Sequence, residues 1–101
     1  MKQSAIRHYI LNGKIAVPCE DIMEWAKHSP LGTRVAETIR DNVRVSTVFL
    51  GLDLQWSNGP PMIFETMVFG GEHDEHQDRC STWDEAEAMH KRVCAMVWIK
   101  P

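Results

Sequence analysis

Hydrophobic and polar residues alternate along much of the chain in the pattern of β-strands. In the segment HYILNGKIAV (8–17), two runs of strand-forming residues flank Asn12-Gly13. Asn-Gly suits a type I′ turn, because both central residues of that turn need a positive φ. The pattern therefore predicts a β-hairpin with Asn12-Gly13 at its tip, and Pro18 ends the second strand.

Two longer hydrophobic runs, Val43 to Leu54 and Met62 to Phe69, predict the centre of a sheet. Both have apolar residues at alternate and at intervening positions, as strands buried on both faces do. In the first run the hydrophobic phase shifts near Ser46-Thr47, which predicts a β-bulge or a change of face there. A further strand is expected over residues 34–39, and a short edge strand at residues 79–81.

Two segments have helical spacing. The first, residues 19–30, has acids in its first turn and bases in its last, which complements the helix dipole. Its expected apolar face consists of Ile22, Met23 and Ala26. The second begins at Thr82, which forms a capping-box pattern with Glu85. Its expected buried stripe contains Ala86, Met89, Val93, Met96 and Val97.

The order of these elements is β-β-α-β-β-β-(β)-α. It predicts one α+β domain over residues 1–101, with a mostly antiparallel sheet of four to five strands and two helices packed on one face. The length of 101 residues, 44% hydrophobic and 25% charged, agrees with one globular domain.

The composition also predicts a cytoplasmic protein. No apolar run approaches the roughly 20 residues that cross a bilayer, so no membrane association is expected. The segment MKQSAIRHYIL lacks the apolar centre of a signal peptide. The three cysteines, an odd number at wide spacing, are interpreted as reduced thiols: Cys19, Cys80 and Cys94.

Charge is distributed unevenly. The net charge is -3, and the acidic segment (residues 72–87) contains seven acids and one base, Arg79. We interpret this segment as a partner-binding surface with contact residues Glu72, Asp74, Glu75, Asp78, Asp84 and Glu87. Residues 34, 40 and 44 are arginines on or near neighbouring strands, but the net charge argues against direct nucleic-acid binding.

No catalytic motif is complete, so the protein is predicted not to be an enzyme and to need no cofactor. His73 and His76, with Cys80 or with His90 near Cys94, offer zinc-binding residue types. Their number and spacing fall short of a structural zinc site, and a solvated loop beside a core cysteine is favoured.

Two residues leave alternatives open. Glu65 lies in an apolar strand and either has a raised pKa at a site or, the favoured reading, pairs with a base such as Arg44 or Arg34 across the sheet. Trp56, in the loop LQWSNGPP, either anchors a partner or covers the end of the sheet, and we include it among the expected partner contacts.

The segments RVSTVFLGLD, GPP, FETMVFGG and STWDEAEA together resemble a group of small proteins common in bacteriophage and prophage genomes. The resemblance extends over residues 43–95 and carries no established activity, so it assigns no catalytic residue. It implies a non-enzymatic phage accessory protein that binds a host macromolecular partner in the host cytosol, such as an anti-CRISPR-type inhibitor of a defence complex. An acidic surface can occupy a groove built for a nucleic-acid backbone.

Two other functions remain open at this point. The chain could be a structural or assembly accessory protein that forms a homodimer or larger homo-oligomer through an exposed sheet edge. A small metal-dependent enzyme is the less favoured alternative.

Overall fold

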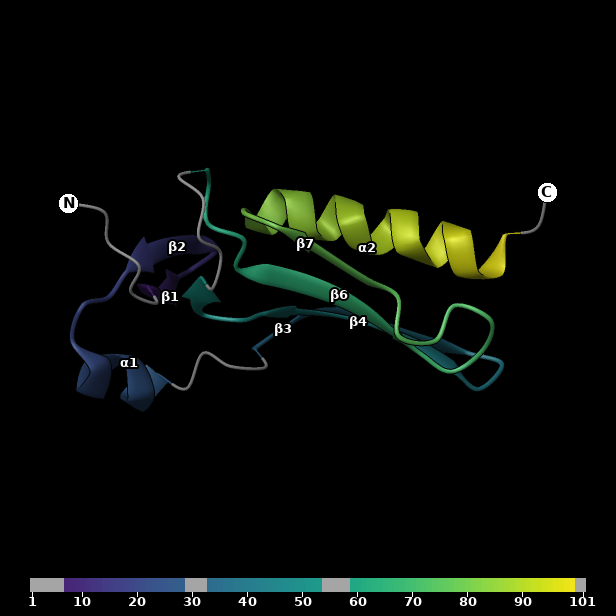
Figure 1. Cartoon of the computed structure of the whole chain (residues 1–101), viewed down its shortest axis with the longest axis horizontal. Helices are drawn as coiled ribbons and strands as arrows, with labels where there is room; N and C mark the ends of the chain where they lie inside the picture. The colour runs from purple at the N-terminus through teal and green to yellow at the C-terminus, as the bar shows by residue number, and fades with distance from the viewer. Residues whose placement is uncertain (1–6, 29–32, 54–58, 100–101) are drawn as a thin grey trace.

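Two antiparallel sheets and two helices make up the structure, a computed structural model that describes residues 7–28, 33–53 and 59–99 (Figure 1). The elements are β1 (Arg7–Asn12), β2 (Ile15–Pro18), α1 (Ile22–His28), β3 (Thr33–Arg40), β4 (Val43–Phe49), β5 (Leu52–Asp53), β6 (Phe64–Phe69), β7 (Gln77–Cys80) and α2 (Trp83–Trp98). The strand orders are β2-β1-β5 and β3-β4-β6-β7. The predicted α+β class is confirmed, although the strands form two sheets where one was expected.

The β1–β2 hairpin is confirmed, but its turn lies one residue further along than predicted. Asn12 pairs with Ile15, so the central residues are Gly13 and Lys14. Gly13 has a φ of 65°, and Lys14 is not among the described residues with positive φ. Glycine at the first central position is the pattern of a type II′ turn, which fits the twist of the strands as a type I′ turn does.

The β3–β4 hairpin has the type I′ pattern instead. Its central residues Asp41 and Asn42 have φ values of 54° and 67°, and short polar side chains tolerate this region better than most. The bulge predicted at Ser46-Thr47 is wrong, because β4 keeps a continuous register with β6. The register shift lies on β3, between Arg34 and Ala36.

Helix α2 covers one face of the four-stranded sheet (Figure 1). Its capping box is confirmed, since the Thr82 side chain accepts from the Glu85 amide and Glu85 accepts from the backbone of Thr82. The core between helix and sheet consists of Val45, Phe49, Phe64, Val68, Ala86, Met89 and Val93. Of the expected helical stripe, Met96 is exposed, and His90 is buried although it was not predicted to be.

Helix α1 lies beside the first sheet, away from α2 (Figure 1), so the prediction that both helices pack on one face of one sheet is wrong. Its contact residue is Trp25, whose indole N–H donates to the Gly51 carbonyl at 3.2 Å and whose ring meets His8 edge-on at 4.8 Å. The predicted apolar face is wrong, because Ile22, Met23 and Ala26 are exposed. The single large indole decides which side of this short helix faces the protein.

The two sheets meet where the chain passes from β4 to β5. Gly51, with a φ of 77°, allows the sharp change of direction, and its carbonyl accepts from the Tyr9 amide at 2.9 Å. Tyr9 belongs to the same core cluster as Phe49, Ile63, Phe64 and Ala86. The N-terminal hairpin is therefore anchored on the main core. In the part of the chain described, neither helix is long and apolar enough to cross a membrane.

Candidate binding surface

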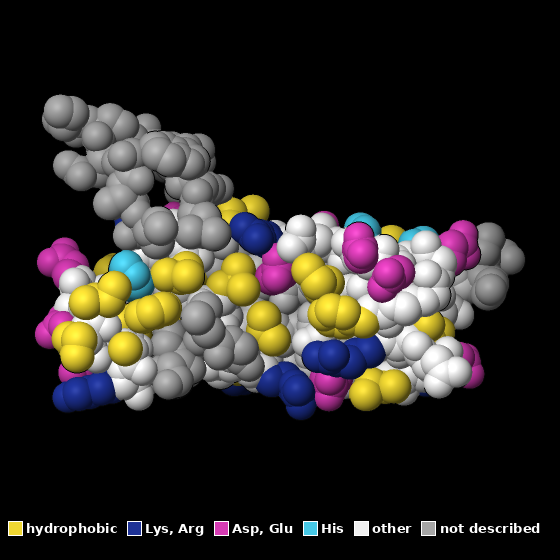
Figure 2. Space-filling view, turned by 60° about the horizontal axis from the view of Figure 1, so that its bottom comes forward, with side chains coloured by type: hydrophobic (Ala, Val, Ile, Leu, Met, Phe, Trp, Pro, Cys, Tyr) yellow, Lys and Arg dark blue, Asp and Glu magenta, His cyan; other side chains and the backbone are white. Residues whose placement is uncertain are grey.

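The four-stranded sheet has a second face, opposite α2, that no described helix covers. Side chains alternate between the two faces of a strand, so the residues between the core positions lie here. We call this surface the open face. It consists of Arg34, Glu37, Ile39, Arg44, Ser46, Val48, Glu65, Met67, Phe69, Gln77 and Arg79. Figure 2, which turns the lower side of Figure 1 forward, shows hydrophobic side chains among Lys/Arg and Asp/Glu side chains on this side of the molecule.

The charged groups of the open face hold one another in place. Glu37 accepts from the Arg44 Nε at 2.7 Å and lies 3.2 Å from an Arg34 nitrogen. On the same face, at β6 and β7, Glu65 accepts from the Arg79 Nε at 3.1 Å and from the Gln77 amide at 2.6 Å. The favoured reading of Glu65 as a cross-strand pair is confirmed, with Arg79 as the partner in place of Arg44 or Arg34. These carboxylates fix three guanidinium groups on one surface.

Two large hydrophobic side chains on the open face remain accessible. Ile39 on β3 is 62% exposed and Phe69 on β6 is 41% exposed. The guanidinium carbon of Arg44 lies 4.7 Å from the centre of the Phe69 ring, within the range of a cation–π contact. Aromatic residues and arginine are enriched in protein interfaces, so this combination marks the open face as a candidate contact surface.

The acidic segment does not form one surface. Glu72, Asp74 and Glu75 lie in the loop between β6 and β7, and Asp78 lies on β7. Asp84 and Glu87 lie in the first turns of α2, at the opposite end of β7 from that loop (Figure 1). The structure therefore separates into two groups the acids that the sequence presents as one run.

Several of these acids have partners inside the chain. Asp74 accepts from the Gly70 amide at 2.6 Å and closes the loop. Asp78 lies 3.3 Å from His76 and 3.9 Å from Arg92. Glu87 accepts from the Trp83 indole at 3.1 Å. Glu72, Glu75 and Asp84, three further predicted contact residues, are also exposed. Trp56, the remaining predicted contact, lies outside the described residues.

The β6–β7 loop packs against the turn between β3 and β4. A Cβ added to Gly70 would lie 2.9 Å from the Asn42 carbonyl oxygen, and one added to Gly71 would lie 2.8 Å from a methyl of Val43. Both glycines have positive φ. Glycine at these positions lets the loop lie at the same end of the sheet as Phe69, next to Val43, whose side chain packs on the core under α2.

A buried polar network lies on the other face of the sheet, under α2. His90 Nδ1 lies 2.7 Å from the Thr47 hydroxyl and His90 Nε2 lies 2.9 Å from the Thr38 hydroxyl. Thr47 also bonds to the Thr66 hydroxyl. Because a hydroxyl can donate or accept, either tautomer of the imidazole satisfies both contacts. Burial lowers the pKa of His90, which favours the neutral ring.

Sequence reasoning missed this network and treated His90 as a zinc-ligand candidate. The sequence signal for this network was the phase shift at Ser46-Thr47, because the polar residue Thr47 occupies a position of β4 that faces the core. Both nitrogens of His90 are engaged by hydroxyls. Burial, followed by the nearby Glu85, raises the pKa of the Cys80 thiol to about 11, which disfavours the thiolate that binds metals. The described residues contain no group of three or more His, Cys, Asp or Glu arranged to hold a metal ion.

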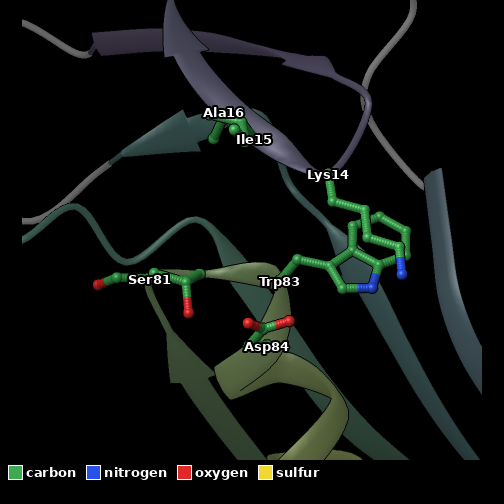
Figure 3. A pocket seen from close by; sticks show the side chains of 7 residues that line it. Lys14, Ile15, Ala16, Ser81, Trp83 and Asp84 are labelled. Carbon is green, nitrogen blue, oxygen red and sulfur yellow. The ribbon is translucent and has the colours of Figure 1, made fainter.

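A pocket of about 290 Å³ lies between the β1–β2 turn and the start of α2 (Figure 3). Lys14 lies alongside the Trp83 ring, with its nitrogen 5.7 Å from the ring centre. The hydroxyl of Thr82, the N-cap of α2, already accepts a hydrogen bond from the Glu85 amide. Trp83 packs edge-on against Phe64 at 6.2 Å. The pocket therefore lies at the contact between the N-terminal hairpin and the start of α2.

Comparison with protein-family models, with curated protein sequences and with solved structures finds no match to this chain. The resemblance to phage proteins therefore stays a prediction from the sequence segments that carry it.

Proposed function

We propose that this protein is a non-catalytic binding protein that attaches to a macromolecular partner through the open face of its four-stranded sheet. The observation that carries the proposal is the exposure of Ile39 and Phe69 on a sheet face that no described helix covers. In line with the phage resemblance, we propose a host protein or defence complex as the partner.

The arrangement of the open face supports a binding role. Phe69 stands at its end beside Arg44, which is held by Glu37. A side chain that is already fixed loses little conformational entropy when a partner binds, so more of the contact energy appears as affinity. Aromatic and arginine side chains are enriched among the residues that supply most of the binding energy of an interface.

Exposed acids in the loop after Phe69 form the rim at this end of the proposed interface. Glu72 and Glu75 follow Phe69 by three and six positions and are exposed. Charges at the rim of an interface mainly steer the encounter and select the partner. A partner with a basic patch, such as a groove that binds a nucleic-acid backbone, fits this rim. This keeps the anti-defence proposal but gives the acidic residues a secondary role.

Affinity capture from bacterial lysate tests the proposal with matched variants. Tagged wild-type protein is compared with Phe69→Ser and with Met23→Ser, which changes a residue 70% exposed on α1. We expect Met23→Ser to retain the captured partner and Phe69→Ser to lose about 30-fold in affinity, the effect of removing a strong interface anchor. Equal capture by all three proteins, each folded by circular dichroism, would overturn the proposal.

A further inference from the structure

Among the strands that the structure describes, the longest lies at the edge of a sheet. β3 has eight residues and forms the margin of the order β3-β4-β6-β7, whereas the opposite edge, β7, has four. Proteins usually protect sheet edges by short strands, charged side chains, proline, bulges or covering elements. On β3 the charge of Glu37 is balanced within the chain by Arg34 and Arg44. β3 contains no proline, and its bulge lies near its start, between Arg34 and Ala36. The stretch from Ala36 to Arg40 is regular.

The hairpin geometry identifies the backbone groups that face away from β4. The two-residue turn pairs Arg40 with Val43, so these residues form a hydrogen-bonded pair. Hydrogen-bonded pairs alternate with non-bonded ones, so Thr38 faces β4 while Glu37 and Ile39 direct their N–H and C=O groups outward. Within the described part of the chain, no backbone hydrogen bond outside the ladder involves Glu37 or Ile39.

We propose that β3 pairs antiparallel with β3 of a second copy of this chain, which joins the two four-stranded sheets into one continuous sheet. An outward row of alternating amide donors and carbonyl acceptors is complementary to another extended strand. A two-fold axis makes the same edge serve both copies and closes the assembly at a dimer. This inference is independent of the proposed partner-binding function.

The register follows from charge. Pairing the outward groups symmetrically around Thr38 places Glu37 opposite Ile39 of the second copy, and the reverse. Symmetry around Glu37 would instead place two Glu37 carboxylates opposite each other, which is unfavourable. Symmetry around Ile39 would place Glu37 opposite the turn residue Asp41. In the register centred on Thr38, the outward N–H and C=O groups of Glu37 and Ile39 are all bonded. They form two hydrogen-bonded pairs between the copies.

Molar mass over a concentration series is the first test. The full chain has a mass of 11.6 kDa. Light scattering after size exclusion, in reducing buffer from about 1 µM to about 1 mM, should show the mass rising toward twice this value. A protein that keeps the monomer mass at the highest concentration overturns the proposal.

Two substitutions at Ile39 then separate its side chain from its amide. Ile39→Ala retains the N–H and should still dimerise, whereas Ile39→Pro removes the outward donor on both copies and blocks strand addition. Proline is tolerated at edge positions whose N–H faces away from the neighbouring strand. Ile39→Pro should weaken the dimer at least about tenfold, through the two lost hydrogen bonds. A dimer unaffected by Ile39→Pro must use another surface and overturns the proposal.

Hydrogen exchange of backbone amides tests the same pairing in the unmodified protein, so this test does not depend on whether Ile39→Pro folds. In dilute protein the amides of Glu37 and Ile39 should exchange rapidly while those of Thr38 and Arg40 are protected. In concentrated protein all four amides should be protected. A dimer in which Glu37 and Ile39 still exchange rapidly contradicts pairing through β3. Because no other protein is present, failure here leaves the partner-capture test of the open face unaffected.

Discussion

The buried network around His90 gives a sharp prediction for Thr47→Val. The substitution keeps the branched shape of the side chain and removes one hydroxyl. That hydroxyl lies 2.7 Å from His90 Nδ1 and also bonds to the hydroxyl of Thr66, with Thr47 and Thr66 fully buried. The variant therefore leaves two buried polar groups without their partner.

The size of the effect follows from the cost of an unsatisfied buried group, about 1–3 kcal/mol each. Two such groups should lower the free energy of unfolding by about 2–6 kcal/mol, a large part of the roughly 5–15 kcal/mol that stabilises a small domain. Thr38→Val removes only the contact at Nε2 and should cost about half as much. Urea denaturation at pH 8, followed by circular dichroism, measures both.

A combined variant tests the cause of the loss. Thr47→Val, Thr66→Val and His90→Leu together remove every member of the network except Thr38, and replacing hydrogen-bonding partners by apolar groups of similar shape can be nearly neutral. The combined variant should therefore be more stable than Thr47→Val alone. If Thr47→Val costs less than about 0.5 kcal/mol, the level of an ordinary surface change, the network does not stabilise the fold as described.

Two further predictions concern His90 and the glycine loop. Burial lowers the pKa of His90 in the folded protein below its ordinary 6.5, so the unfolded chain binds the proton more readily. The free energy of unfolding should therefore be highest above pH 6.5 and fall as the pH drops below that value, by up to about 1.4 kcal/mol per pH unit. His90→Leu should abolish this dependence when denaturation is measured as a function of pH. Gly70→Ala should destabilise the protein by about 1 kcal/mol more than Gly13→Ala in thermal unfolding. Both glycines have positive φ, but only a Cβ at Gly70 would meet a backbone oxygen, at 2.9 Å. Equal losses of stability would show that the loop moves away from Asn42.

Elements with strong local signals could be predicted from the sequence. The capping box at Thr82 needs only residues three apart, and the β1–β2 hairpin needs only its turn residues and flanking strands. The position of the first turn was missed by one residue, because glycine suits the first central position of one turn type and the second of another.

Features that depend on distant contacts could not be predicted in the same way. Trp25 sets the orientation of α1 through the Gly51 carbonyl, which lies 26 positions away in sequence. Thr47 appeared as a break in the strand pattern, since its partner His90 is 43 positions away. The acidic run is divided by β7, and no local signal shows at which end of a strand each acid lies.

The open face shows the same limit for the candidate site. Met67 and Phe69 made β6 read as a strand buried on both faces, yet only the face under α2 is covered by a described helix. Which face a helix covers depends on how the chain after β7 returns over the sheet. The exposure of Phe69, and with it the candidate surface, follows from that path.

Side-chain footprinting of the partner complex tests the central claim most directly. Backbone exchange is a poor probe here because β4 and β6 are already hydrogen-bonded on both sides, whereas hydroxyl radicals report the accessibility of side chains. With the partner bound, oxidation of Met67 and Phe69 should fall strongly while oxidation of Met23 on α1 stays unchanged. Protection of Met23 with unchanged oxidation of Met67 and Phe69 would contradict binding through the open face.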